Sequence, residues 1–269
     1  MKNKEIIIGS QGGGLGDNLQ ITPLFKYFTN ATLEIINNDY GKDLSAVYET
    51  IANKIEFKEK PIRQEVFFSK YGNPERSEPL RNGALNYLTI FGIENEVSPI
   101  PKINLNQEEL KKTEEKLAKY KNPIALVTYG GGYKKHDVLQ QYPEYRLLEK
   151  NKWQFIVNEL SKTYSVIHFF KGDNLMQLEN CIEINNLSIY ELKHYFAIIK
   201  KYLGIDTGSY HLMLAVNGFA HVIVPDLSWQ HQYCPSNWQY EERLWEKEEY
   251  MRVKYYNKNR EWQNVLNYL

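Results

Sequence analysis

The stretch "YLGIDTGSYHLMLAVNG", residues 202–218, decides the fold class that this sequence predicts. Its first part, "YLGID", is a short apolar run typical of a buried strand. The part that follows, "GSYHLMLAVNG", has the spacing of a short helix that ends at Gly218, and "AHVIVP" is the next strand. A strand that leads through one turn into a helix, and then into another strand, is typical of parallel sheets with right-handed crossovers.

The same alternation extends toward the N-terminus in two series. The predicted strands lie at residues 4–9, 31–37, 123–132 and 165–170, and the predicted helices at residues 17–30, 43–53, 80–92, 107–120, 153–162 and 188–201. Between the two series, Pro99 and Pro101 push the backbone toward extended forms. We therefore predict an N-terminal lobe (1–97), a linker (98–105), a C-terminal lobe (106–260) and an amphipathic helix (261–269) that packs back on the N-terminal lobe.

The composition narrows the function classes. Lys+Arg and Asp+Glu both number 33, so the formal net charge is zero, which argues against a nonspecific nucleic-acid binder with its usual basic excess. The two cysteines, Cys181 and Cys234, fit no metal or redox spacing and indicate a reducing compartment. The N-terminal apolar run is too short for a signal peptide, and no run is long enough for a membrane span. We expect a cytoplasmic protein.

Three segments each follow a predicted strand and point to one ligand site. They are residues 9–17, 129–132 and 206–211. In open parallel sheets ligands bind beyond the carboxyl ends of the strands, so these segments are expected to meet there. The first and third lead directly into a helix, whose free N–H groups and positive dipole end suit a phosphate.

The first of these segments, "GSQGGGLGD", matches neither a spaced dinucleotide fingerprint nor a P-loop. Its glycines fit either a tight turn or a backbone that lies close to a ligand. Asp17 fits either a helix N-cap or a general base at the mouth of a helix. In the third segment, Asp206 and Thr207 fit either a helix cap or a ligand site, and His211 fits either a packed core histidine or a ligand contact.

Taken together, "GLGDNLQITP" and "DTGSYH" resemble the motifs of the heptosyltransferase family of glycosyltransferases, glycosyltransferase family 9. That family carries a G-L-G-D loop followed by a proline early in the chain and a D-T-G-x-x-H element late. The segments at residues 100–132 and 152–160 also resemble its linker, second-lobe first strand and Trp-bearing helix, so the resemblance spans most of residues 5–225.

The resemblance implies a GT-B architecture, in which two Rossmann-like lobes with parallel sheets face a cleft. It also implies an inverting transfer, without a metal, from a nucleotide-diphosphate sugar to an acceptor hydroxyl. By this resemblance Asp17 is the general base, and the donor-binding residues include Asp206, Thr207, Gly208 and His211. The sequence contains no D-x-D pair, so we expect no metal and no cofactor besides the sugar nucleotide.

The remaining donor-binding candidates are glycines and lysines. Gly14, Gly16 and Gly130 are expected to let the backbone approach the donor. The family places a lysine near its tryptophan, and here Lys152, beside Trp153, is favoured over Lys134, which follows the glycines. Each lysine also fits a solvated surface position. An apparent insertion at residues 136–151 separates the two and departs from the family pattern.

The acceptor cannot be read from the sequence. Neutral net charge favours a glycan, and hence surface glycan or related glycoconjugate synthesis, whereas a modified nucleic-acid base or a protein side chain stays open. Two alternatives to transfer also stay open: a non-catalytic module that binds nucleotide sugars, and an epimerase or hydrolase on the same scaffold. Peripheral membrane contact and the oligomeric state stay open as well.

Overall fold

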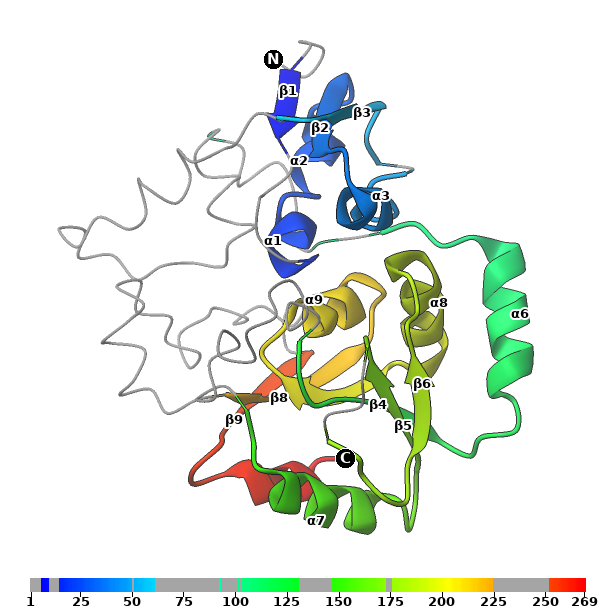
Figure 1. Ribbon diagram of the computed structural model, residues 1–269, viewed down its shortest axis with the longest axis vertical. Coiled ribbons are helices and arrows are strands. Elements are labelled where there is room, and N and C mark those ends of the chain that lie inside the picture. The colour runs from blue at the N-terminus through cyan, green and yellow to red at the C-terminus, as the bar shows by residue number, and fades with distance from the viewer. Residues whose placement is uncertain are drawn as a thin grey trace, which may run out of the picture. The chain divides into compact units, whose positions relative to one another are not determined.

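The computed structural model describes residues 6–9, 15–49, 51–60, 92, 101, 103–130, 147–172, 176–224 and 252–269. Among them, the residues up to Asn104 form one compact unit and those from Leu105 onward form a second (Figure 1). Each unit has its own parallel sheet. Apart from Gly92, the helix predicted at residues 80–92 lies outside the described residues.

The first unit is built on a parallel sheet with the strand order β1-β2-β3. Its elements are β1 (Ile6–Gly9), α1 (Leu15–Gln20), α2 (Leu24–Tyr27), β2 (Ala31–Ile36), α3 (Asp39–Ser45) and β3 (Lys54–Lys58). The central strand β2 is buried over its first five residues, because it has a partner strand on each side. The sequence pattern predicts no strand at β3, because charged residues interrupt its short apolar run at Lys54, Glu56 and Lys58.

The helix predicted at residues 17–30 is in fact two short helices, and this prediction is wrong in its continuity. Proline has no N–H to donate, and its ring crowds the preceding helical turn. Pro23 therefore sits at the N-cap of α2, outside both helices. Tight turn bonds fill the gap, from Leu24 N–H to the Ile21 carbonyl (3.0 Å) and from Phe25 N–H to the Thr22 carbonyl (3.2 Å).

The second unit is built on a parallel sheet with the strand order β6-β5-β4-β7-β8-β9. Its strands are β4 (Pro123–Val127), β5 (Ser165–Phe170), β6 (Ile182–Asn185), β7 (Lys201–Ile205), β8 (Phe219–Val224) and β9 (Val253–Asn257). Its helices are α6 (Gln107–Leu117), α7 (Lys150–Leu160), α8 (Ile189–Ile199), α9 (Gly208–Ala215) and the 3-10 helix η4 (Trp262–Asn267). The parallel topology that the strand–helix alternation predicts is confirmed in both units.

Helices cover both faces of the second sheet (Figure 1). On one face α7 buries Trp153, Ile156 and Val157 against Ile124 and Leu126 of β4. On the other face α8 packs through an aromatic row, in which the Phe196 ring lies 5.5 Å from the Phe169 ring and 6.0 Å from the Tyr202 ring. A parallel sheet covered on both faces accounts for strands that are apolar along most of their length.

A buried histidine joins α6 to α8. The Asn106 side chain caps α6 by accepting hydrogen bonds from the N–H groups of Glu108 (2.9 Å) and Glu109 (3.1 Å). The Asn106 N–H itself donates to Nε2 of His194 (3.0 Å), whose Nδ1 lies 2.7 Å from the Tyr190 carbonyl. The start of α6 is therefore fixed to the side of α8.

The last residues, for which the sequence predicts an amphipathic helix at 261–269, belong to the second unit. The segment forms the 3-10 helix η4, which lies against α7 and β9. Val265 is fully buried in the core beneath α7, and the Trp262 ring meets the Phe155 ring edge to face at 5.8 Å. Apolar side chains of this segment thus close the core of its own lobe.

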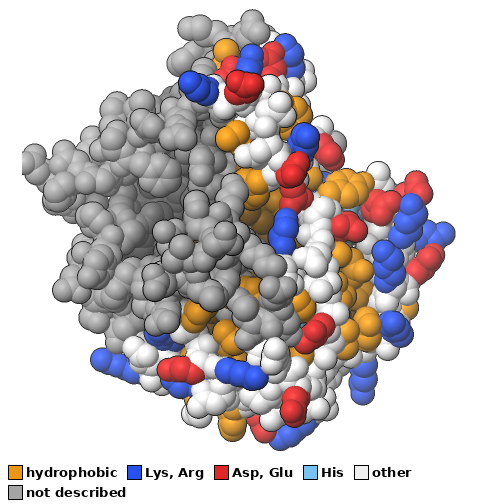
Figure 2. Space-filling model, viewed as in Figure 1, with side chains coloured by type: hydrophobic (Ala, Val, Ile, Leu, Met, Phe, Trp, Pro, Cys, Tyr) orange, Lys and Arg blue, Asp and Glu red, His pale blue; other side chains and the backbone are white. Residues whose placement is uncertain are grey.

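Acidic and basic side chains are interspersed over the described surface in the view of Figure 2. This mixture agrees with the balanced count of charges in the sequence. Among the helices that the structure describes, none has the length and apolar composition needed to cross a membrane.

Candidate functional site

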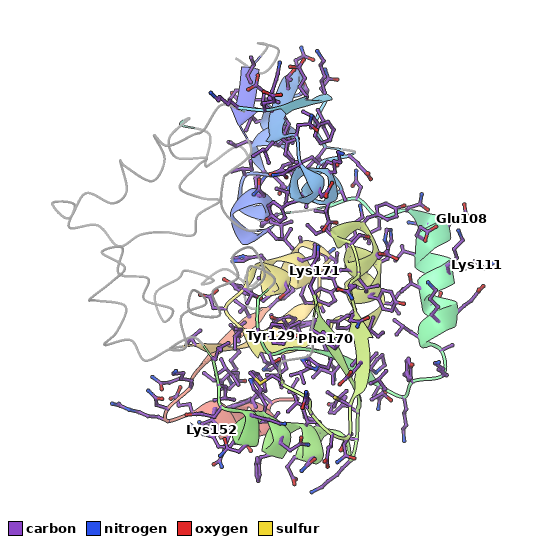
Figure 3. All side chains as sticks on the ribbon, in the orientation of Figure 1. Glu108, Lys111, Tyr129, Lys152, Phe170 and Lys171 are labelled. Atoms are coloured by element: carbon purple, nitrogen blue, oxygen red, sulfur yellow. The ribbon has the colours of Figure 1, made fainter. Side chains whose placement is uncertain are left out.

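The carboxyl ends of β4 and β7 lie side by side in the second unit, because the two strands are parallel neighbours with Val127 opposite Gly204. Tyr129 and Gly130 follow β4, and the segment Asp206–Gly208 follows β7. The Tyr129 ring lies 6.3 Å from the ring of His168 on β5. Figure 3 labels Tyr129 together with Phe170, the last residue of β5, and Lys171, which follows it. The topology therefore brings two of the three predicted ligand segments to one edge of one sheet.

The turn from β7 into α9 leaves the start of the helix open. Thr207 is the N-cap residue, with an extended backbone, but its side chain accepts no hydrogen bond from the first turn. The Tyr210 N–H bonds to the Thr207 carbonyl (3.2 Å). Among the described residues, the N–H groups of Gly208 and Ser209 make no hydrogen bond. Two donors at the positive end of a helix dipole suit an anion.

The Thr207 hydroxyl is held instead in a chain of three hydroxyl groups, which we call the hydroxyl chain. Thr207 Oγ1 lies 2.5 Å from Ser209 Oγ, and Ser209 Oγ lies 3.1 Å from the Tyr202 phenol oxygen. The Tyr202 phenol donates to the Ile205 carbonyl at 3.3 Å. Tyr202 is fully buried, so the chain is anchored inside the lobe.

Gly204 makes room for the Tyr202 ring on β7. A Cβ atom at residue 204 would lie 2.5 Å from the Tyr202 phenol oxygen and 2.5 Å from the Val127 carbonyl oxygen. Any other residue would therefore collide with both the ring and the neighbouring strand. The glycine in "YLGID" lets the phenol extend along the strand to the turn that begins α9.

A second polar pair lies between β4 and β5 near the same edge. Thr128 Oγ1 is 2.9 Å from Nε2 of His168, and both residues are fully buried. Burial lowers the pKa of His168 to about 4, so the ring is neutral at pH 7. Its Nδ1 atom has no hydrogen-bond partner among the described residues.

The predicted donor residues of α9 and β4 occupy consistent places at this edge. Gly130 is buried after β4, Asp206 and Gly208 are half-buried, and His211 is half-buried on α9. The His211 ring lies 3.9 Å from the Tyr210 ring. Their roles stay predictions, since the placement of a residue does not assign its ligand.

The other predicted site residues belong to other elements. Gly16 and Asp17 are the second and third residues of α1 in the first unit, and Gly14 and Lys134 lie outside the described residues. Lys152 is on α7, away from Tyr129 and Phe170 in Figure 3.

Lys152 has an acidic neighbour of its own. Its Nζ lies 2.8 Å from a Glu149 carboxylate oxygen and 5.8 Å from the centre of the Trp262 ring. The hydrogen bond from Lys152 lowers the pKa of Glu149. A diphosphate would have to compete with this carboxylate for Lys152.

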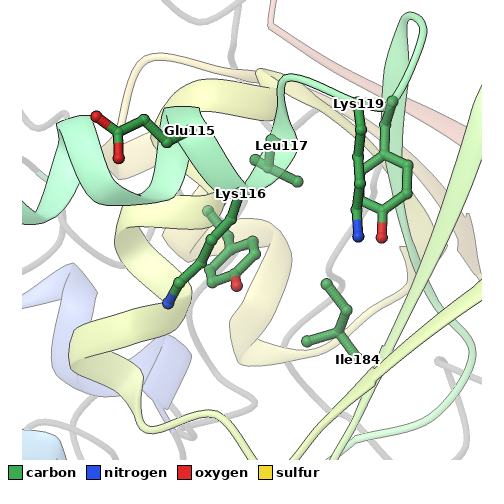
Figure 4. Close-up of a pocket in the computed structure, with 7 residues that line it drawn as sticks. Glu115, Lys116, Leu117, Lys119 and Ile184 are labelled. Carbon is green, nitrogen blue, oxygen red and sulfur yellow. The ribbon is translucent and has the colours of Figure 1, made fainter.

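An open pocket of about 350 Å³ lies away from these strand ends (Figure 4). Its lining comes from the end of α6, from β6 and from α8: Glu115, Lys116, Leu117, Lys119, Tyr120, Ile184 and Tyr195. No predicted site residue lines it. Among the described residues, no group of three or more His, Cys, Asp or Glu side chains is placed to hold a metal ion.

Sequence reasoning missed the residues that shape the open helix start: Tyr202, Gly204 and Ser209. A signal for Gly204 was present, because a glycine inside an apolar strand marks a close approach of other atoms. Nothing in the sequence pattern pairs the Tyr202 phenol with the Ser209 hydroxyl, since the contact depends on how the ring lies on the strand.

Comparison with known proteins gives a clear likeness in structure. No protein-family model matches the chain, and no curated protein sequence matches it. The glycosyl transferase family 9 protein from Veillonella parvula DSM 2008 matches with a TM-score of 0.59 at 12% identity, over 82% of this chain and 80% of that protein. The E. coli ADP-heptose LPS heptosyltransferase II matches with a TM-score of 0.56 at 10% identity, over 97% and 96%.

TibC, an iron-containing dodecameric glycosyltransferase from enterotoxigenic E. coli H10407, matches with a TM-score of 0.53 at 14% identity, over 83% of this chain and 58% of TibC. At such low identities the likeness shows the fold alone. The predicted α/β fold class, with parallel sheets as in GT-B glycosyltransferases, is confirmed.

Proposed function

We propose that this chain is a glycosyltransferase that moves a sugar from a nucleotide-diphosphate sugar to an acceptor hydroxyl. The observation that carries the proposal is the open start of α9, which follows β7 at the carboxyl edge of the second sheet. The glycosyltransferase fold and the "DTGSYH" motif, Asp206–His211, support the same assignment. Each would be weaker evidence without the other.

The donor diphosphate is proposed to bind at the start of α9. When the sugar is transferred, the departing nucleoside diphosphate gains negative charge, and N–H donors aimed at it stabilise the transition state. The N–H groups of Gly208 and Ser209, which make no hydrogen bond to any residue that the structure describes, are such donors, with the helix dipole behind them. Asp206 and His211 are proposed to contact the donor from either end of the motif.

Asp17 is proposed as the general base. An acceptor hydroxyl must lose its proton as it attacks the sugar, and a positioned carboxylate contributes about 10²- to 10⁴-fold to such a step. Asp17 lies in the first turn of α1, directly after the glycine-rich loop. Attack on the face opposite the leaving diphosphate inverts the sugar configuration, so we propose an inverting reaction.

The finer assignments extend the same proposal. The acceptor is proposed to be a surface glycan or a related glycoconjugate, and the reaction to run in the cytoplasm, as the low cysteine count favours. The transfer is proposed to need no metal, in contrast to TibC, which is described as iron-containing. A TibC structure with ADP-D-beta-D-heptose makes ADP the first nucleotide to test as the donor's leaving group.

The test is a thermal-shift panel with ADP, UDP, GDP, CDP and TDP, each with and without EDTA. A ligand at 100 times its Kd stabilises the folded state by about 2.7 kcal/mol, which raises the melting temperature by roughly a few degrees in a chain of this size. We expect one nucleotide to stand out, with the same shift in EDTA. No shift with any nucleotide would contradict donor binding, and a shift lost in EDTA would contradict metal independence.

Asp17→Asn separates transfer from binding. We expect the variant to keep the nucleotide-induced shift and to lose about 10²-fold or more in turnover. Asp39→Asn, on the exposed start of α3 in the same unit, makes the same chemical change and is expected to keep turnover. If Asp17→Asn keeps near-wild-type turnover, the base assignment is wrong. Nucleotide binding without any released product in the wild type would favour the non-catalytic binding module instead.

A further inference from the structure

Tyr202 occupies a position that the motif residues do not explain. It lies in the middle of the second lobe, fully buried, and its ring lies along β7 over Gly204. Its phenol oxygen is 3.1 Å from Ser209 Oγ and 3.5 Å from Thr207 Oγ1. These two hydroxyl groups belong to the N-cap and the first turn of α9, where the donor diphosphate is proposed to bind.

We propose that Tyr202 is a positioning residue that keeps the start of α9 open for the donor diphosphate. This inference rests on the proposed function. Tyr202 acts by holding the Ser209 and Thr207 hydroxyl groups in the hydroxyl chain, away from the backbone N–H groups that bind the anion. It does not itself touch the donor.

The direction of the hydrogen bonds follows from the groups in the chain. A carbonyl oxygen only accepts, so the Tyr202 proton goes to the Ile205 carbonyl. Ser209 then donates to the Tyr202 oxygen, and Thr207 donates to Ser209. In this arrangement each hydroxyl proton is used once, and the order of the chain depends on the phenol at its buried end.

The competing state is an ordinary capped helix. A threonine at the N-cap normally accepts a hydrogen bond from the second or third N–H of the helix, here Ser209 or Tyr210. Such a bond would occupy a donor that the diphosphate needs. Without the Tyr202 phenol, Ser209 loses its buried acceptor, and the Thr207 hydroxyl is free to turn toward these N–H groups.

The energy of one cap sets the expected effect. A side-chain cap contributes about 0.5–2 kcal/mol to a helix, and 1.4 kcal/mol corresponds to a factor of ten in affinity. Tyr202→Phe removes only the hydroxyl and keeps the ring over Gly204. We therefore expect the Kd of the nucleoside diphosphate to rise by between about twofold and thirtyfold.

The experiment is a double-mutant cycle in the full-length chain. The Kd of ADP, or of the panel nucleotide that gives the largest shift, is measured by calorimetry for the wild type, Tyr202→Phe, Thr207→Val and the double variant. Valine at residue 207 cannot cap, so we expect Tyr202→Phe to have little effect in that background, whatever Thr207→Val does alone.

Tyr256→Phe is the matched control. Its phenol is also buried in this lobe, and it lies 2.8 Å from Nδ1 of His221 on β8. We expect this variant to lower the melting temperature at least as much as Tyr202→Phe does, with an unchanged Kd. That pattern would separate positioning from general loosening of the lobe.

Three results would overturn the inference: an unchanged Kd in Tyr202→Phe, an equal effect of Tyr202→Phe in the Thr207→Val background, or an equal rise of Kd in Tyr256→Phe. A wild type that binds none of the five nucleotides would instead contradict the proposed function.

Discussion

The starts of α8 and α9 make an instructive pair. Both helices begin beyond the carboxyl end of a strand of the second sheet, and both have a hydroxyl residue at the N-cap. Ser188 forms a capping box at α8: its Oγ accepts from the Glu191 N–H (3.2 Å), and a Glu191 carboxylate oxygen accepts from the Ser188 N–H (2.9 Å). Thr207 makes no such bond at the start of α9.

The start of α9 therefore lacks the local stabilisation that the cap gives to the start of α8. A capped helix start satisfies its N–H groups internally and has little left for a ligand. An open start lacks that local stabilisation and keeps donors for an anion, which is a typical property of binding sites. By this criterion we expect the donor to bind at the end of β7 rather than at the end of β6.

The helices α8 and α9 both depend on the folded sheet of the second unit. Buried histidines in this sheet make its stability depend on pH. The folded-state pKa of His168 is lowered to about 4 by burial, below its ordinary value of 6.5. The unfolded chain therefore takes up the proton first, so the stability contribution is present above pH 6.5 and is lost as the pH falls toward 4. We expect about 2–3 kcal/mol less stability at pH 4.5 than at pH 7 from this group.

Urea denaturation at the two pH values measures this loss, and His168→Gln is the informative variant. It keeps a polar atom near Thr128 but does not titrate, so we expect the difference between pH 7 and pH 4.5 to shrink. His221, whose pKa is also lowered to about 4, chiefly by burial, accounts for part of the remaining difference. An undiminished pH difference in His168→Gln would show that His168 is not the sensitive group.

Gly204→Ala should disturb the start of α9 indirectly, by displacing the Tyr202 phenol that holds the hydroxyl chain. The added Cβ would lie 2.5 Å from the Tyr202 phenol oxygen and from the Val127 backbone. Overpacking of this kind costs about 1–3 kcal/mol, and we expect the displaced phenol to raise the nucleotide Kd as well. Denaturation and calorimetry measure the two effects.

Gly218→Ala, at the far end of α9, is the control for Gly204→Ala. Its added Cβ would meet the buried Met213 side chain and not the Tyr202 phenol, so we expect a loss of stability with an unchanged Kd. Equal effects of both variants on the Kd would argue that α9 responds to any crowding.

The sequence predicts more of the fold than of the site. The apolar runs of β4, β5, β7 and β8 stand out because central parallel strands are buried on both faces. The strands β3, β6 and β9 lie at sheet edges, and their short runs mix charged or polar residues with apolar ones, so they give no clear pattern. The break at Pro23 was readable from the chemistry of proline, but the apolar spacing across it favoured one helix.

The candidate site also has a part that the sequence predicts and a part that it does not. The turn residues Asp206, Thr207 and Gly208 are contiguous, so a motif finds them. Whether Thr207 caps its helix depends on a phenol five residues earlier, on the ring orientation, and on the absence of a Cβ at Gly204. Those are properties of packing, and no local pattern encodes them.

Ser188→Ala should remove the N-terminal cap of α8. It removes the hydroxyl that accepts the Glu191 N–H and lies 2.7 Å from the Glu191 carboxylate. We expect a loss of about 1 kcal/mol in the free energy of unfolding and no change in the nucleotide Kd. Ser188→Asn replaces one good cap with another and is expected to stay near the wild type. A weaker nucleotide affinity in Ser188→Ala would place the binding edge at α8 as well.

Thr207→Asn should add an N-terminal cap to α9, and we expect it to have the smallest effect on stability. The longer side chain can reach the N–H groups two and three residues ahead, as Asn106 does for Glu108 and Glu109 at the start of α6. We expect an unchanged or slightly higher stability, by up to about 0.5 kcal/mol, because a cap is gained where none existed. The same cap would occupy the donors of Ser209 and Tyr210, so the nucleotide Kd should rise by about tenfold. A variant that is both less stable and unchanged in affinity would mean that Thr207 already supports the helix and that the open start of α9 is not where the nucleotide binds.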